Sequence, residues 1–168
     1  MGLSAVFPAG SRVCLARSGD AARGFYALYG GVPGCRAEDF GAAMSLSSSF
    51  NSLFYRTAEE AAPDYCGGVG SDLQEAAGGP FTFPGHRSIA CEELDHRGPI
   101  TITVYALAGE PARGAPARAP AVIYFASIIT RPGRAPADLR MFRAFLATAH
   151  IGTLARDADT VNRSPSRQ

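Results

Sequence analysis

The chain has 168 residues, of which 46% are hydrophobic and only 18% charged, and its formal net charge is +1 at pH 7. This composition supports one packed core and excludes the low-hydrophobicity, high-charge signature of disordered chains. It also excludes a global field that attracts nucleic acid, and no apolar run reaches the roughly eighteen residues of a membrane span. A lightly charged surface is typical of a protein that a partner partly covers, so we expect a protein partner, no nucleic acid and no direct membrane insertion.

Two short apolar patches near the N-terminus, Val13–Leu15 and Phe25–Tyr29, are separated by Gly and Asp turn signals and predict strands. Between residues 37 and 56 the apolar residues are roughly helix-spaced and the first turn is acidic, which predicts a helix. The residues that carry this helical pattern are Glu38, Asp39, Phe40, Met44, Leu46 and Phe50. A second, short helix is predicted at Thr57–Ala62, which opens with a capping-box pattern and which Pro63 interrupts.

Residues 67–99 indicate a long connection, because Gly and Pro turn signals recur throughout it. Cys66 and Cys91 bracket most of this connection, so a disulfide between them is physically sensible. Together with Cys14 and Cys35 they make four widely spaced cysteines, without a Cys-x-x-Cys pair or a His at ligand spacing, which argues against zinc. Two disulfides with three connectivities, or four buried thiols, both remain open; no signal peptide is visible, which favours thiols.

The clearest block of the chain runs from Ile100 to Gly152. The runs Ile100–Leu107 and Val122–Thr130 are rich in β-branched and aromatic residues and predict an antiparallel hairpin with a long, exposed Ala/Arg/Pro loop. An amphipathic helix over Pro136–His150 follows, with Pro at its first position and Gly152 just after its end. Its apolar stripe consists of Leu139, Phe142, Phe145, Leu146 and Ala149.

These elements predict an α+β fold. We expect a small antiparallel β-sheet, built on the hairpin 100–107/122–130 and packed by the C-terminal amphipathic helix 136–150. The N-terminal half is expected to be irregular, and disulfides can staple it. Residues 1–155 are predicted to form a single domain, and 156–168 a disordered polar tail.

The best catalytic candidate is the stretch Cys91–His96, which places a thiol, carboxylates and an imidazole within six residues, with His86 as an alternative base. No nucleophile signature surrounds Cys91, however, and the crowded carboxylates are weak support for a metal site. The chain also lacks a phosphate-binding loop, a dinucleotide-binding fingerprint and a nucleophile elbow. We therefore expect no catalytic residue, no metal and no cofactor, with a thiol enzyme that uses Cys91 as a minor alternative.

The densest basic group consists of Arg131, Arg134, Arg140 and Arg143, which span the loop before the helix and one helix face. A phosphate or carboxylate site is one interpretation of such a group. Because Asp138 is adjacent and no aromatic residues are interleaved, we expect these arginines to form a solvated face and not an anion site.

Two further blocks are distinctive. One is Phe125–Arg131, followed by a Gly/Pro/Ala spacer and by Leu139-Arg140 at the opening of the helix. The other is Asp64–Val69 with Leu73 behind it, a cysteine–x–glycine–hydrophobic pattern that Cys35 precedes and Cys91 follows. These blocks resemble herpesvirus glycoprotein L, above all its gammaherpesvirus branch, over residues 35–152, and the distances of Cys35 and Cys91 from Cys66 are similar to those of that family. A Lys-free, Arg-rich composition is also common in GC-rich herpesvirus genes.

The resemblance implies a non-catalytic subunit that folds with and binds glycoprotein H in the envelope fusion machinery, at the virion surface or in the secretory pathway. It further implies that Cys14 and Cys35 pair with Cys66 and Cys91, and it makes the sequon at Asn162 a glycosylation candidate. Because the stripe of the predicted helix must cover the sheet, we expect partner contacts from residues 1–99. The candidates are Phe25, Tyr26, Tyr29, Phe54 and Tyr55.

An alternative of a different class remains open. The chain would then be an intracellular α+β interaction or regulatory protein, viral or bacterial, with reduced cysteines.

Overall fold

The computed structural model describes residues 2–17, 23–28, 43–66, 68–93, 99–111 and 119–152. The strands are β1 (Gly2–Ser4), β2 (Arg12–Arg17), β3 (Arg23–Leu28), β4 (Ala43–Phe50), β5 (Ser88–Glu93), β6 (Thr101–Pro111), β7 (Pro120–Ile129) and β8 (His150–Gly152). The helices are α1 (Ala58–Tyr65), α2 (Ser71–Ala76) and α3 (Ala135–Thr148). Helices and antiparallel sheets together make an α+β fold, as predicted.

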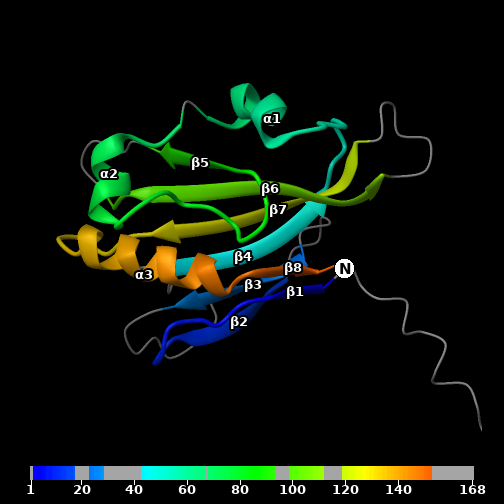
Figure 1. Ribbon diagram of the computed structural model, residues 1–168. Helices are drawn as coiled ribbons and strands as arrows, with labels where there is room; N and C mark the ends of the chain where they lie inside the picture. Colours follow the sequence, from blue (N-terminus) through cyan, green and yellow to red (C-terminus); the bar gives the residue numbers. More distant parts are fainter. Residues whose placement is uncertain are drawn as a thin grey trace, which may run out of the picture.

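Six strands form one antiparallel sheet in the order β2-β3-β4-β7-β6-β5 (Figure 1). The predicted hairpin lies inside it: β6 pairs with β7 from Thr101 opposite Ile129 to Pro111 opposite Pro120. The predicted N-terminal strands are β2 and β3, which pair with each other and join the sheet through β4. The strands β1 and β8 form a separate two-stranded sheet, so the first and last described residues lie side by side.

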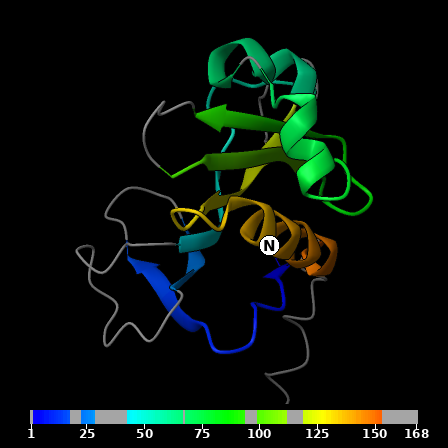
Figure 2. The ribbon, with the colours of Figure 1, turned by 90° about the vertical axis from the view of Figure 1, so that its left-hand side faces the viewer.

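The main core lies between this sheet and α3, which Figure 2 shows beside the strands. Side chains alternate along a strand, and the register brings Leu46 and Val104 to the two sides of Ala126 on the same face. The predicted apolar stripe of α3 packs on this face and is confirmed. The largest buried side chains of this core are Met44, Leu46, Phe81, Phe83, Ile102, Val104, Tyr124, Ile128, Leu139, Phe142, Phe145 and Leu146.

A buried ion pair ties the start of α3 to the chain before it. Asp138 is only 1% exposed, and it accepts hydrogen bonds from the Arg131 backbone N–H (2.7 Å) and from Nε (3.1 Å), while Nη2 completes the pair. Burial alone would raise the pKa of Asp138, but these hydrogen bonds and the charge of Arg131 lower the pKa below its ordinary value of 3.8. Helix α3 begins one residue earlier than predicted, so Pro136 lies at its second position and not at its first. One member of the predicted basic group is therefore neutralised inside the protein.

We expect Asp138→Asn to lower the free energy of unfolding by about 2 kcal/mol at pH 7, because the half-buried guanidinium of Arg131 loses its counter-charge. Since the pKa of Asp138 is lower in the folded protein than in the unfolded chain, its stabilisation is complete above the unfolded value. It is lost as pH falls from about 4 through the folded pKa. Urea unfolding of both proteins at pH 7 and pH 3 measures this: the difference should shrink at the lower pH. Asp72→Asn, in the exposed first turn of α2, is the control and should change stability by less than about 0.5 kcal/mol.

The helix predicted between residues 37 and 56 is wrong for the part that the structure describes, which is strand β4. Met44 and Leu46 are buried, and Ser45 and Ser47 alternate with them, so the pattern has the period of a strand. Ser45 faces Ser127 of β7, with their Oγ atoms 2.6 Å apart. Pairing on both sides, with β3 and β7, supplies the hydrogen bonds that override the helical spacing.

The N-terminal half is also more regular than predicted. The connection expected over residues 67–99 contains α2 and β5, and β5 extends the sheet by pairing with β6. Helix α1 runs to Tyr65, past the predicted stop at Pro63, whose exposed ring lies inside the helix and removes one backbone donor. At the other end of the chain, His150 belongs to β8 and not to the last turn of α3, since Ala149 is already extended.

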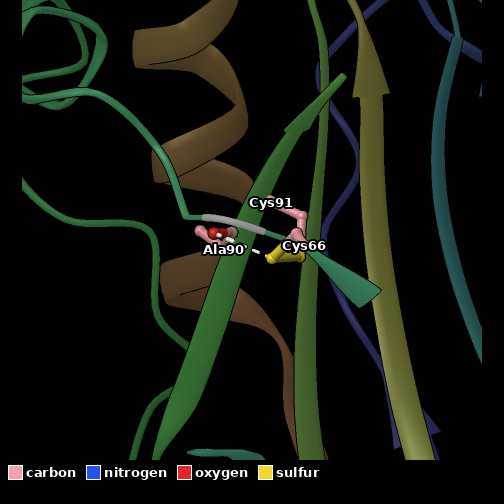
Figure 3. The surroundings of a disulfide bond; sticks show 3 residues. All are labelled: Cys66, Ala90 and Cys91. Atoms are coloured by element: carbon pink, nitrogen blue, oxygen red, sulfur yellow. Dashed lines mark hydrogen bonds between the residues drawn. A yellow bond between two sulfur atoms is a disulfide. The ribbon is translucent and has the colours of Figure 1, made fainter. Parts of the chain in front are cut away.

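A disulfide between Cys66 and Cys91 joins the end of α1 to β5, with the two Cα atoms 5.3 Å apart (Figure 3). The Cys66 Sγ lies 3.7 Å from the carbonyl oxygen of Ala90. This disulfide is the one that the sequence suggested, because Cys66 and Cys91 bracket most of the connection over residues 67–99. It corrects the pairing that the family resemblance implied, because Cys66 and Cys91 bond to each other. Cys14 is disulfide-bonded as well, whereas Cys35 lies outside the described residues.

Candidate functional site

The main exposed apolar surface of the described chain is the 50–55 loop, by which we mean the last residue of β4 and the five residues that follow it. Five large apolar side chains are exposed among those whose burial the structure describes, and three of them belong to this loop. These are Phe50 (52% exposed), Leu53 (65%) and Phe54 (37%). The rings of Phe50 and Phe54 meet edge to face with centroids 6.4 Å apart. A cluster of this kind is typical of a surface that a partner covers.

Asn51 holds the loop from inside. Its side chain is 1% exposed, donates to the carbonyl oxygens of Tyr55 (2.8 Å) and Pro120 (2.9 Å), and accepts from the Tyr55 N–H (3.2 Å). The Asn51 backbone N–H donates to Ala121 of β7. The side chain therefore closes the turn and fastens it to the sheet, so the apolar residues are presented from a fixed backbone.

Phe54 has an unusual backbone conformation, with φ at 58°. Among the described residues it is the one non-glycine residue at positive φ. A bulky side chain in this left-handed region costs roughly 1–2 kcal/mol. A glycine would relieve this cost, so the presence of an exposed aromatic ring here points to a use of the ring itself.

The far end of the loop is anchored by Tyr55, which points inward. It is 8% exposed, packs with Ala61 and Ile123 on the sheet face opposite α3, and donates from its hydroxyl to Asp64 of α1. Helix α1 then begins with the predicted cap, in which the Glu60 N–H donates to Thr57 Oγ1 at 3.1 Å. The Glu60 carboxylate accepts from the backbone N–H of Arg56, one residue earlier than a standard capping box requires.

The five predicted partner contacts lie in different places in the structure. Phe54 lies on the exposed apolar loop, but Tyr55 is a core anchor, and we no longer count it as a contact residue. Phe25 and Tyr26 lie in β3, paired with Leu46 and Ser45 of β4. Tyr29 and the glycosylation candidate Asn162 lie outside the described residues.

Phe50 and Leu53 belong to the loop but were not among the predicted contacts. Phe50 was one of the residues that carried the predicted helical pattern, and no pattern pointed to Leu53. The sequence signal that could have exposed them is Asn51-Ser52, a pair of turn-forming residues directly after the serine-rich strand.

The candidate catalytic stretch Cys91–His96 does not form a site among the described residues. Cys91 is 5% exposed and its sulfur is bonded to Cys66, so it carries no thiol that could act as a nucleophile in this form. His96 lies outside the described residues. No cluster of three or more His, Cys, Asp or Glu side chains in the described ranges is arranged to hold a metal ion.

The described helices are all too short or too polar to cross a membrane. No protein-family model matches this chain, and comparisons with curated proteins and with solved structures found no match.

Proposed function

We propose that this protein is a non-catalytic binding subunit that docks a protein partner through the 50–55 loop. The observation that carries the proposal is the pairing of exposure with rigidity: Phe50, Leu53 and Phe54 face solvent on a backbone held by buried Asn51. Burying such side chains is worth about 1–2 kcal/mol each. A preformed loop loses little conformational entropy on binding, so most of that energy contributes to affinity.

The surroundings of the loop support a partner-facing role. Its two flanks are fixed, by β4 in the sheet and by capped helix α1, whose end is joined to β5 through Cys66. Aromatic residues clustered at the centre of an interface are the usual binding hot spots. The loop would therefore act as the central contact.

The narrower form of the proposal follows the resemblance to glycoprotein L. In this form the partner is a glycoprotein H-like protein, the complex is a heterodimer at the virion envelope or in the secretory pathway, and the subunit supports folding and membrane fusion. The apolar loop suits a subunit that is permanently covered. The alternative is an intracellular α+β interaction protein that uses the same loop on a different partner and keeps its cysteines reduced.

We expect Leu53→Asp to weaken partner binding at least about thirtyfold, because a charge would be buried against an apolar surface. Immobilised protein first identifies the partner in extracts of the source cells, and the purified pair then yields Kd by calorimetry. Co-expression with gammaherpesvirus glycoprotein H ectodomains tests the narrower form directly. Val6→Asp is the matched control, since Val6 is 70% exposed and lies in the connection after β1. Equal affinities of the Leu53 and Val6 variants would contradict the proposal.

Phe54→Gly separates binding from stability. Glycine accepts the positive φ of this position, so the free energy of unfolding should stay unchanged or rise by up to about 1 kcal/mol. Loss of the ring should nevertheless weaken partner binding at least about tenfold. Calorimetric Kd values and urea unfolding of the same preparation measure both effects. A variant with unchanged affinity would show that the ring is not a contact.

Thiol titration distinguishes the two forms of the proposal. The envelope form predicts no free thiol in the unfolded, unreduced protein isolated from its native compartment, and four free thiols would refute it. The intracellular form predicts four free thiols.

A further inference from the structure

A pocket of about 450 Å³ lies between α3 and the segment that follows α2. Ala144 and Ala147 of α3 line one side, and Pro80 and Pro84 line the other. Arg140 and Arg143 also line the pocket, from the same face of α3. The volume falls in the range of small-ligand sites. The pocket therefore combines small apolar surfaces with two guanidinium groups.

The backbone after α2 is shaped around Arg143. A Cβ atom at Gly79 would stand 3.0 Å from Arg143 Nη2 and 3.2 Å from its Cζ, so the glycine leaves space for the guanidinium. Arg140 is fixed nearby, because its Nη1 donates to the carbonyl oxygen of Ala76 at 3.3 Å. Both exposed side chains thus lie at the pocket, between the chain that follows α2 and α3, and Arg140 is tethered there by its hydrogen bond to Ala76.

The charge of Arg143 has no compensating partner among the described residues. Within the ranges that the structure describes, its guanidinium makes no hydrogen bond and no ion pair, and no carboxylate lines the pocket. Arg131 provides the contrast, because buried Asp138 neutralises it. Two like charges three residues apart on a helix repel each other, and an oxyanion between them would remove that repulsion and occupy the guanidinium donors.

We propose that this pocket binds a small organic carboxylate. The carboxylate contacts Arg140 and Arg143, and an apolar body rests on the alanines of α3 and on Pro80 and Pro84. The site lies along α2 and α3, whereas the 50–55 loop follows the far end of β4 (Figure 1). It is therefore independent of the proposed partner contact, and either proposal can fail without the other.

The test uses benzoate as the probe, with benzamide as its neutral counterpart and inorganic phosphate as an anion without an apolar body. In two-dimensional amide NMR of the full chain, benzoate should shift the signals of Gly78, Gly79 and Ala144 saturably. Benzamide and inorganic phosphate should each bind at least about tenfold more weakly than benzoate. Benzamide lacks the negative charge for the arginines, and inorganic phosphate lacks the apolar body.

Variants assign the binding to the pocket. Arg143→Gln and Arg140→Gln should each weaken benzoate binding at least about fivefold. Ala144→Leu should block it sterically while leaving both guanidinium groups in place. Arg87→Gln is the matched control, because its side chain is 83% exposed and pairs with Glu59 away from this pocket, and it should not change benzoate binding.

Four outcomes would overturn the proposal. They are the absence of saturable shifts up to about 50 mM benzoate, equal binding of benzamide, equal or tighter binding of inorganic phosphate, and unchanged affinity in the Arg143 and Ala144 variants.

Discussion

Loss of the Cys66–Cys91 disulfide is expected to lower the free energy of unfolding by about 3.5 kcal/mol. The bond closes a loop with a sequence separation of 25 residues, and the entropy that such a crosslink removes from the unfolded chain corresponds to this value. The Cys66→Ala/Cys91→Ala variant, compared with the oxidised protein by urea unfolding, measures the effect. The bond fastens α1 to β5, so the variant should also expose amides of α1 to faster hydrogen exchange.

A reducing agent provides the control for this variant. When both proteins are fully reduced, their stabilities should agree within about 1 kcal/mol, because neither then contains a crosslink. A difference that persists under reduction would contradict the expected origin of the effect and would assign it to the packing of buried Cys91.

The second large effect is expected at Asn51. Asn51→Ala should lower the free energy of unfolding by about 3 kcal/mol, because it leaves the Tyr55 N–H and the carbonyl oxygens of Tyr55 and Pro120 buried without their partner. It should also weaken partner binding, since the freed loop must be ordered again in the complex. Urea unfolding and calorimetric Kd values measure the two consequences.

Ser52→Ala is the matched control for Asn51, because Ser52 is the exposed neighbour in the same turn. It should change stability by less than about 0.5 kcal/mol and leave affinity unchanged. If Asn51→Ala lowered stability but left affinity unchanged, the link between loop rigidity and binding would be wrong while the structural role of Asn51 would stand.

Asn51→Ala and the Cys66→Ala/Cys91→Ala variant both affect the 50–55 loop, the first within the loop and the second through the helix that follows it. Asn51 fixes the loop to β7 through Ala121 and Pro120, and the disulfide fixes the helix that follows the loop. If the apolar loop is the partner contact, both variants should reduce affinity, but Asn51→Ala should do so more strongly because it acts within the loop itself.

Much of the fold could be predicted where the signal lies within one short stretch of sequence. The two runs that became β6 and β7 are rich in β-branched and aromatic residues, and the stripe from Leu139 to Ala149 repeats with the helical period. The cap at Thr57 could be predicted for a similar reason, since it needs only residues three positions apart. Each of these signals is complete within one short stretch of chain.

The same reasoning failed for residues 43–50. The spacing of Met44, Leu46 and Phe50 fits a helix loosely and a strand better, but only the strands on both sides of β4 decide between them. That error also concealed the candidate site, because the exposure of Phe50 and Leu53 depends on where β4 ends against β7.

The sequence by itself determined the hairpin, the α3 stripe, the Thr57 cap and the α+β class, because these depend on neighbours that are close along the chain. The tertiary structure alone decided the pairing of Cys66 with Cys91 and the six-strand order of the sheet. It also divided the predicted basic face, pairing Arg131 with Asp138 and placing Arg140 and Arg143 at a pocket. The physical reason is that pairing, burial and charge compensation depend on contacts between distant segments, which no local period encodes.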